Sequence, residues 1–250
     1  MNESNTLEGK VVLITGAAHR IGATTARMLH AAGANIVLHY RNSSTGAEAL
    51  QTELNAVRAD SVCLVQGDLH DTDTLPGLVE QAYAAWCRLD VLVNNASTFY
   101  PTPVGTVTEA HWDDLMGSNL KAPFFLAQAA APHLKTERGC IVNIVDIHAD
   151  RPLKEHPVYS MAKAGLVMMT KSLACELGPE VRVNAIAPGA ILWPENDMDE
   201  STKEKIIERT FLKRQGCPQD IARAALFLIR DADYTSGQIL NVDGGRSLNS

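Results

Sequence analysis

Three side chains near the middle of the chain have the types and the spacing of a proton-transfer site. Asp146 opens the stretch DIHADRPLKEHPVYSMAK (146–163), and Tyr159 and Lys163 lie at its end. Residues four apart share one face of a helix, and Pro157 is well placed just before such a helix. A free phenol, with a pKa of about 10, exchanges protons poorly at neutral pH, but a nearby ammonium group favours the phenolate and eases the exchange. We therefore expect Tyr159 to pass a proton while Lys163 tunes it.

The elements that must position these residues are short runs rich in Val and Ile, which indicate strands buried on both faces. The runs span 11–15, 35–40, 61–66, 90–94, 140–145, 181–187 and 238–242. Helical periodicity lies between them, for example at 21–33, 74–86 and 219–230. Because strand and helix alternate with short connections, right-handed crossovers generate a parallel sheet covered on both sides. We predict an α/β fold, a Rossmann-type, doubly wound, seven-stranded parallel sheet with helices on both faces.

The chain is expected to form one domain over residues 1–250, since no linker, repeat or low-complexity segment divides it. With 46% hydrophobic residues it can bury a substantial core. The stretch GAILWPENDMDESTKEK (189–205) is charged and irregular, and we predict a mobile segment beside a binding cleft there.

Composition and charge limit the classes of partner. The net charge of −7 and the scattered positions of the 22 Lys and Arg residues argue against a nucleic-acid surface. The polar opening MNESNTLEGK and the lack of a long apolar run predict a cytoplasmic protein with no membrane partner. The five cysteines contain no C-x-x-C pair, so we expect free thiols and no metal site.

The first predicted strand runs into the glycine-containing turn TGAAHRIG (15–22) and then into a helix. Backbone N–H groups at such a helix start suit a pyrophosphate. Only Gly16 and Gly22 remain of the usual glycines, and Arg20 stands where a middle glycine is expected. The turn alone is therefore compatible with cofactor binding or with a plain strand-to-helix turn.

The end of the second strand, HYRNSS (39–44), indicates which dinucleotide would bind. An acid at this place would bond the ribose hydroxyls of NAD and repel an extra phosphate, and none is present. Arg41, Ser43, Ser44 and Arg20 would instead donate charge-assisted hydrogen bonds to a 2′-phosphate. The sequence thus favours NADPH over NADH, the alternative being a solvated arginine in a turn.

Seven features occur in one order along the whole chain: TG(x)5G at 15–22, GDL at 67–69, NNAS at 94–97, Asn119, YSMAK at 159–163, PG at 188–189 and TSGQILNVDGG at 235–245. Together they resemble the short-chain dehydrogenase/reductase family. The resemblance implies that Asp68 lies near the adenine, that residues 94–96 line the cofactor, and that Pro188 and Gly189 lie beside the nicotinamide. It also implies that Lys163 grips the ribose, that Asn119 joins the catalytic set, and that the protein is a homotetramer. The expected cofactor-binding residues are Gly16, His19, Arg20, Ile21, Gly22, Tyr40, Arg41, Asn42, Ser43, Asp68, Leu69, Asn95, Ala96, Ser97, Tyr159, Lys163, Pro188 and Gly189.

Asp146 departs from that family, most of whose members have a serine that orients a substrate carbonyl thirteen residues before the tyrosine. A carboxylate would repel a developing alkoxide, but it suits a nitrogen heterocycle whose C=N reduction requires a proton on the ring nitrogen. With Arg20 in the turn, HYRNS after the second strand, NNASTFYPTP (94–103) and GAILWPE (189–195), the chain resembles the pteridine reductase branch. That resemblance implies reduction of pterins, with dihydrofolate as a further candidate, by NADPH.

The same resemblance implies that Phe99 stacks on the pterin, that Ser97 bonds substrate or cofactor, and that Arg20 contacts the pterin or the phosphates. The expected substrate-binding residues are Arg20, Ser97, Phe99, Asp146 and Tyr159. An aromatic residue in an apolar loop is also common in a core, which is the alternative for Phe99. A carboxyl group is ionised at neutral pH, so Asp146 is expected to relay a proton from Tyr159 or water. His148 and His156 either line the substrate mouth or make local hydrogen bonds.

Two other functions compete with this interpretation. The first is reduction of an oxoacyl thioester or another carbonyl by an enzyme of the same family, against which Asp146 and Phe99 argue. The second is an NADPH-binding sensor without turnover, which arises when the catalytic pair is lost. The presence of Tyr159, Lys163 and Asn119 argues against the sensor.

Overall fold

The computed structural model describes residues 6–193 and 199–249, in which seven parallel strands form one sheet. The strands are β1 (Val11–Ile14), β2 (Asn35–Tyr40), β3 (Val62–Gln66), β4 (Val91–Asn94), β5 (Cys140–Ile144), β6 (Arg182–Pro188) and β7 (Ile239–Val242). Their order in the sheet is β3-β2-β1-β4-β5-β6-β7, and every neighbouring pair is parallel. All seven predicted strands are confirmed.

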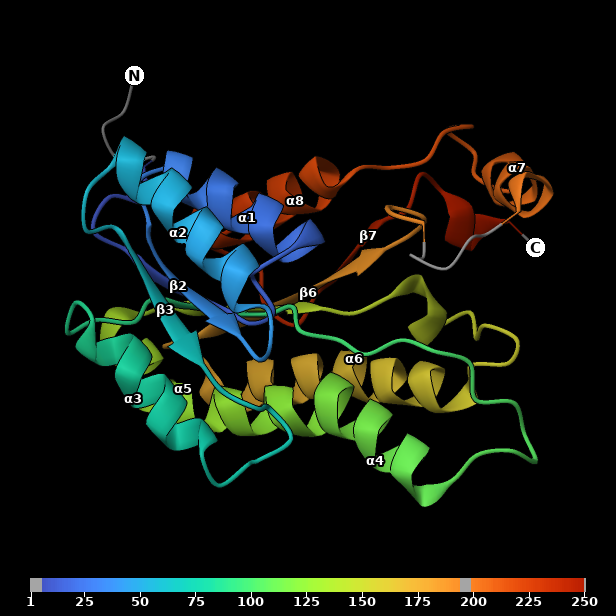
Figure 1. Cartoon of the computed structure of the whole chain (residues 1–250), viewed down its shortest axis with the longest axis horizontal. Coiled ribbons are helices and arrows are strands. Elements are labelled where there is room, and N and C mark those ends of the chain that lie inside the picture. The colour runs from blue at the N-terminus through green and yellow to red at the C-terminus, as the bar shows by residue number, and fades with distance from the viewer. Residues whose placement is uncertain (1–5, 194–198, 250) are drawn as a thin grey trace.

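Helices cover both faces of the sheet, as predicted for a doubly wound fold. They are α1 (Arg20–Ala31), α2 (Ser44–Val57), α3 (Leu75–Ala84), α4 (Glu109–Met116), α5 (Ala122–Glu137), α6 (Pro157–Leu177), α7 (Glu200–Glu208) and α8 (Pro218–Arg230). Figure 1 shows α1, α2 and α8 on one face and α3, α5 and α6 on the other. Three short segments complete the fold: η1 (Gly117–Lys121), η2 (Ile147–Ala149) and η3 (Arg246–Leu248).

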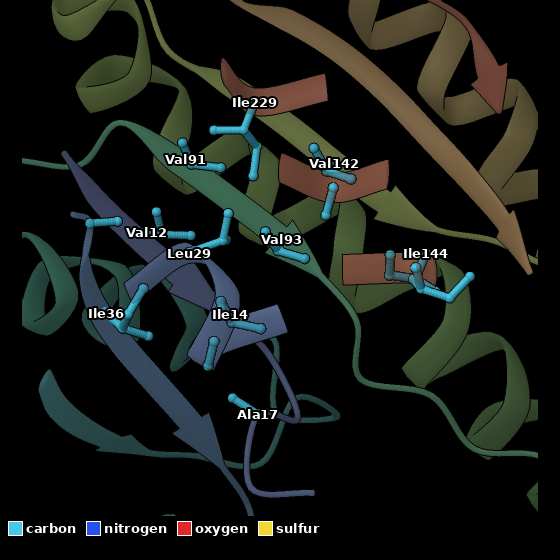
Figure 2. Close-up of a cluster of buried hydrophobic side chains, with 14 of the residues drawn as sticks. Val12, Ile14, Ala17, Leu29, Ile36, Val91, Val93, Val142, Ile144 and Ile229 are labelled. Carbon is cyan, nitrogen blue, oxygen red and sulfur yellow. The ribbon is translucent and has the colours of Figure 1, made fainter. Parts of the chain in front are cut away.

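The sheet lies between two buried hydrophobic clusters, because successive side chains of each strand point to opposite faces. Val12 and Ile14 of β1 pack with Leu29 of α1 in one cluster, which Figure 2 shows. Val11 and Leu13 belong to the second cluster, beneath α3, α5 and α6. Each fully buried aliphatic side chain stabilises the fold by about 1.5–3 kcal/mol, so the strand ends are firmly placed.

The strand order reverses between β1 and β4, which are neighbours although two strands separate them in the sequence. The chain leaves β1 toward α1 on one face and leaves β4 toward α4 and α5 on the other (Figure 1). Such a reversal opens a crevice at the carboxyl ends of the strands, where ligands bind in open parallel sheets.

The stretch 189–205 differs in part from the irregular segment that we predicted. Residues from Glu200 onward form α7, whose start is capped by Asp199 through a 2.9 Å hydrogen bond from the backbone N–H of Thr202. No residue of α7 is buried, so its sequence lacks the apolar period that marks a packed helix. Residues 194–198 lie outside the described residues, and the mobility of the stretch stays a prediction.

None of the helices in the described ranges has the length and the apolar character needed to cross a membrane.

Candidate active site

A cavity of about 520 Å³ lies at the reversal between β1 and β4. It is formed by the first turn, the end of β2, the residues after β3 and the loop after β4, together with Ser118 of η1. Its lining residues are Gly16, His19, Arg20, Ile21, Gly22, His39, Arg41, Asn42, Ser43, Asp68, Leu69, His70, Asn95, Ala96, Ser97, Thr98 and Ser118. Of the expected cofactor residues, Tyr40, Tyr159, Lys163, Pro188 and Gly189 lie outside this lining.

The first turn packs directly against the end of β4, which is why it contains glycine. A Cβ on Gly16, whose φ is +60°, would lie 3.0 Å from Cα of Ala96, and a Cβ on Gly22 would lie 2.5 Å from the Gly16 carbonyl oxygen. The Thr15 hydroxyl oxygen accepts the backbone N–H groups of Asn95 and Ala96, both at 3.0 Å. The Asn95 amide in turn donates to the carbonyl oxygens of Thr15 and Gly16. Thr15 opens the TG(x)5G feature, but its role in joining the two strand ends was not predicted from the sequence.

Arg20 occupies the place of the missing glycine with a left-handed backbone, at φ +53°. This conformation costs a residue with a Cβ about 1–2 kcal/mol, which explains why glycine is expected there. The Arg20 guanidinium donates a 3.2 Å hydrogen bond from Nη2 to the carbonyl oxygen of Trp193. Arg20 therefore links the first turn, which lines the cavity, to the segment that follows β6.

His39 also supports the first turn, a role that we did not predict from its place as a polar residue in the apolar run NIVLHY. Its side chain is buried, with Nδ1 accepting the Gly16 N–H at 3.3 Å and Nε2 lying 3.1 Å from the Gly67 carbonyl oxygen. A proton on Nε2 satisfies both contacts. Burial lowers the pKa of His39 to about 4, so the ring is neutral at physiological pH.

The end of β2 carries the cationic group expected there. Nη1 of Arg41 lies 3.8 Å from Oδ1 of Asp68, and both side chains are about half exposed. An exposed ion pair of this kind contributes at most about 1 kcal/mol, so Arg41 can exchange Asp68 for another anion. Asn42 and Ser43 lead from this point into α2. Backbone N–H groups at such a helix start favour negative charge.

Asp146, Tyr159 and Lys163 converge at the carboxyl end of β5. Tyr159 and Lys163 lie one turn apart near the start of α6, and both are almost fully buried. The Tyr159 hydroxyl donates a 2.8 Å hydrogen bond to Oδ2 of Asp146, while Oδ1 accepts the His148 N–H at 2.8 Å. Nζ of Lys163 donates to the Ile144 carbonyl oxygen at 3.0 Å and lies 5.7 Å from the centre of the Tyr159 ring.

This arrangement holds the proton on the phenol, whereas we expected the nearby ammonium group to favour the phenolate. Burial, together with the charge and the hydrogen bond of Asp146, raises the pKa of Tyr159 well above its ordinary value, and a hydrogen bond with Ser97 acts in the opposite direction. Burial lowers the pKa of Lys163 to about 8, against the opposing charge of Asp146. Lys163 bonds a backbone carbonyl while Asp146 accepts from the phenol, so Tyr159 is a protonated hydrogen-bond donor to Asp146.

Asn119 reaches this group through Ser97. It lies in η1, a π-helical segment of the kind that occurs frequently at functional sites. Its Oδ1 accepts the Ser97 hydroxyl at 2.6 Å, and its Nδ2 donates to the carbonyl oxygens of Thr98 and Leu115 at 3.0 and 2.9 Å. Asn119 therefore fixes the loop after β4, and that loop carries Ser97 to the phenol.

Phe99 is not a core residue, since 46% of its surface is exposed. Its ring packs edge-to-face on Tyr159, with centroids 4.8 Å apart, and stacks on His156 at 4.7 Å and 13°. The two histidines of this loop make local contacts, which was one of the two expectations for them. Nδ1 of His156 lies 2.9 Å from the Lys154 carbonyl oxygen, and Nδ1 of His148 lies 2.9 Å from the Arg151 carbonyl oxygen.

Other expected residues lie at neighbouring strand ends. Asn94 turns away from the cavity, and its amide donates at 2.8 Å to Asn143 on β5. Pro188 ends β6, and a Cβ on the following Gly189 would lie 2.7 Å from Cα of Asp243. Tyr40 ends β2. Across residues 6–193 and 199–249, no three His, Cys, Asp or Glu side chains form a group that could hold a metal ion.

A family model described as Enoyl-(Acyl carrier protein) reductase matches residues 16–247, which include the whole cavity and the Tyr159–Lys163 pair. The chain belongs to the short-chain dehydrogenase/reductase family. Pteridine reductase 1 of Leishmania tarentolae is 37% identical to this short-chain dehydrogenase/reductase, over 95% of this chain and 96% of that protein. Two 3-oxoacyl-[acyl-carrier-protein] reductases FabG are similar to nearly the same degree. The one from Thermotoga maritima is 35% identical over 96% of this chain and 98% of its own, and the one from Staphylococcus aureus is 34% identical over 94% and 97%.

The chain is therefore an oxidoreductase, and the reductases of this family use nicotinamide cofactors. The residues present fit such a dinucleotide. Gly16 and Gly22 let the first turn pack closely against the loop after β4, and the cavity runs from this turn past the cationic end of β2. The cavity of this short-chain dehydrogenase/reductase reaches Ser97, which interacts with the Tyr159 hydroxyl.

Proposed function

We propose that this short-chain reductase uses NADPH to reduce pterins, including dihydropterins and biopterin, with dihydrofolate as a further candidate. The observation that carries the proposal is the 2.8 Å hydrogen bond from the Tyr159 hydroxyl to the Asp146 carboxylate. A carbonyl reductase must stabilise a developing alkoxide, which a carboxylate repels. A ring nitrogen that must gain a proton is instead well served by a carboxylate linked to a phenol.

The choice of NADPH rests on the charges around the end of β2. Arg41 and Arg20 both line the cavity, and no acid follows Tyr40 directly. Asp68, the acid nearby, comes from the end of β3 and is already opposed by Arg41. A 2′-phosphate would take the place of Asp68 on Arg41 and would find the start of α2 at Ser43 beside it.

The cofactor-binding residues are assigned along the whole length of the dinucleotide. The first turn and the loop after β4 hold the phosphates and the ribose, Asp68 and Leu69 lie at the adenine end, and Pro188 and Gly189 lie at the nicotinamide end. The full assignment is Gly16, His19, Arg20, Ile21, Gly22, Tyr40, Arg41, Asn42, Ser43, Asp68, Leu69, Asn95, Ala96, Ser97, Tyr159, Lys163, Pro188 and Gly189. When bound, NADPH supplies the hydride.

The chain's own catalytic residues handle the proton. Tyr159 keeps its proton in the resting site, passes it to Asp146, and Asp146 delivers it to the ring nitrogen. Lys163 holds the ribose. Asn119 positions Ser97, which bonds the substrate or the cofactor. The raised pKa of the phenol keeps this proton on Tyr159 until the ring nitrogen draws it through Asp146.

Phe99 is assigned to the flat face of the substrate. Nearly half of its surface is open although it packs against the catalytic tyrosine. Aromatic rings prefer offset-stacked partners, and a bicyclic heterocycle supplies such a partner beside Tyr159. Arg20, which lines the cavity, is assigned to the pterin or to the phosphates.

The test is a substrate panel with the purified chain. NADPH oxidation is followed by loss of absorbance with dihydrobiopterin, dihydromonapterin, biopterin, dihydrofolate and an acetoacetyl thioester, and the panel is repeated with NADH. We expect turnover of the dihydropterins, with a preference for NADPH of at least about tenfold, which is the effect of losing one charged hydrogen bond. Turnover of the thioester alone would contradict the proposal.

The second candidate, a 3-oxoacyl thioester reductase, is favoured by the FabG relatives, whose identities are within a few per cent of that of the pteridine reductase. Turnover confined to the thioester would support it. NADPH binding without turnover of any substrate would support the non-catalytic sensor.

A homotetramer and a cytoplasmic location stay predictions. Large apolar side chains are exposed on α4, α5 and α6, which lie together on one face of the sheet (Figure 1): Trp112, Phe124, Met161 and Met168. A second copy would cover them. Light scattering on the purified chain tests this, with four times the 27.0 kDa chain mass as the expected result.

A further inference from the structure

The loop that carries Phe99 is fastened to the loop that precedes α6. The backbone N–H of Thr102 donates a 2.6 Å hydrogen bond to the carbonyl oxygen of Glu155, whose backbone is left-handed at φ +66°. The backbone N–H of Leu153 donates to the Ser160 hydroxyl on α6 at 3.3 Å. The two loops therefore meet between Phe99 and the first turn of the helix that holds Tyr159.

His156 lies at this meeting point, and its ring is held from two sides. It is the residue that caps the start of α6, and its carbonyl oxygen accepts the Ser160 N–H at 3.0 Å. Its Nδ1 lies 2.9 Å from the Lys154 carbonyl oxygen. A carbonyl only accepts, so Nδ1 carries the hydrogen, and this bond fixes the plane of the imidazole.

The fixed imidazole lies nearly parallel to the Phe99 ring, with an interplanar angle of 13° and centroids 4.7 Å apart. Tyr159 meets Phe99 at 78°, with centroids 4.8 Å apart. One face of the Phe99 ring is thus covered by His156, its position along the site is set by Tyr159, and 46% of the residue is left exposed.

We infer that His156 is a positioning residue, which backs Phe99 and holds its open face toward a flat heterocyclic substrate. The inference rests on the proposed function and specifies one part of it: the substrate must be planar enough to stack on a ring that cannot swing away. Without His156 the Phe99 side chain gains other rotamers, and part of the stacking is lost each time a substrate binds. The turnover of bound substrate does not depend on this contact.

The experiment compares steady-state kinetics of wild type, His156→Ala and His156→Phe with dihydrobiopterin and NADPH. We expect His156→Ala to raise KM for dihydrobiopterin about fivefold, within the range of one aromatic pair, with kcat and the KM for NADPH within twofold of wild type. His156→Phe keeps a flat ring at this place but lacks the bond to the Lys154 carbonyl oxygen, so it should restore only part of the wild-type KM. An unchanged or lower KM in His156→Ala would overturn the inference, as would a KM in His156→Phe as high as that in His156→Ala.

The matched control is His133→Ala. His133 on α5 also stacks on an aromatic ring, that of Tyr83 on α3, at 4.1 Å and 20°, but it lies outside the site. A general loss of stability on removing a stacked histidine would appear in both variants, whereas the rise in KM should appear only in His156→Ala. A similar rise in KM in His133→Ala would contradict a positioning role.

A spectroscopic readout separates this inference from the proposed function. Stacking on Phe99 shifts the ring-proton NMR signals of His156 upfield, and Phe99→Leu should remove the shift. Signals that do not respond to Phe99→Leu would overturn the inference. The two proposals can also fail separately. If Phe99→Leu removes the His156 shift but the wild-type protein reduces no pterin, the proposed function is overturned and the ring contact stays established.

Discussion

The Tyr159 hydroxyl donates a 2.8 Å hydrogen bond to the Asp146 carboxylate, so the catalytic phenol faces an anion rather than a neutral hydroxyl. Burial and this anion together raise the pKa of Tyr159. The ammonium group of Lys163 does not cancel the effect, because it donates to the Ile144 carbonyl oxygen and loses part of its own basicity through burial. Tyr159 consequently stays protonated at neutral pH, with its hydrogen directed at the carboxylate.

Asp146→Asn should let Tyr159 ionise at a lower pH than in wild type, because the substitution removes the charge that holds the phenol proton. Burial continues to raise the pKa in the variant, so the change is partial. The measurement is tyrosinate absorbance during an alkaline titration, with the matching Tyr159→Phe spectrum subtracted from each protein. Superimposable titrations would show that Asp146 does not act on the phenol.

Lys163→Met should change how stability depends on pH. The pKa of Lys163 in the folded protein is about 8, below its ordinary value of 10.5. The unfolded chain thus binds more protons between these values, and the lysine's contribution to stability rises with pH across that window. In urea unfolding, the free energy of unfolding of wild type should rise by about 2 kcal/mol more than that of Lys163→Met between pH 8 and 10. Parallel pH profiles would contradict the assigned burial.

Substitutions of Arg20 separate its backbone from its side chain. Its φ of +53° is unfavourable for alanine and acceptable for glycine, so Arg20→Gly should be more stable than Arg20→Ala by about 1 kcal/mol in urea unfolding. Both variants lose the guanidinium of this cavity-lining residue, so both should bind NADPH less tightly than wild type. An alanine variant at least as stable as the glycine variant would refute the left-handed backbone.

Arg41→Ala should weaken NADPH selectively. Loss of one charge-assisted contact to the 2′-phosphate predicts a KM for NADPH raised about tenfold, with the KM for NADH nearly unchanged. The control is Arg27→Ala, since Arg27 is a similarly exposed arginine on α1 that pairs with Glu53 away from the cavity. An equal loss for both cofactors in Arg41→Ala would place the arginine elsewhere in the binding site.

The strands could be predicted from sequence because a doubly covered parallel sheet requires continuous Val- and Ile-rich runs, which few other structures need. The first turn was predictable for a related reason, since Gly16 and Gly22 mark a close approach of two backbones. The start of α7 was missed because a helix with no buried residue carries no apolar period.

Contacts between segments that are distant in the sequence limited how much of the candidate site could be predicted. Thr15 and His39 act through backbone groups of other strand ends, so their residue types alone carried no signal. The direction of the Tyr159 pKa shift depends on where the Lys163 ammonium points, which spacing along a helix does not specify. Phe99 likewise left two alternatives open until its neighbours in space were known.

The most direct measurement is the kinetics of Asp146→Ser beside wild type, with dihydrobiopterin and an acetoacetyl thioester as substrates. Asp150→Ser, which removes an exposed acid from the same loop, serves as the control. A role in proton delivery predicts that Asp146→Ser lowers kcat for dihydrobiopterin by about a hundredfold or more, leaves NADPH binding within twofold and does not impair the thioester reaction. Pterin turnover equal to that of wild type in Asp146→Ser would contradict it.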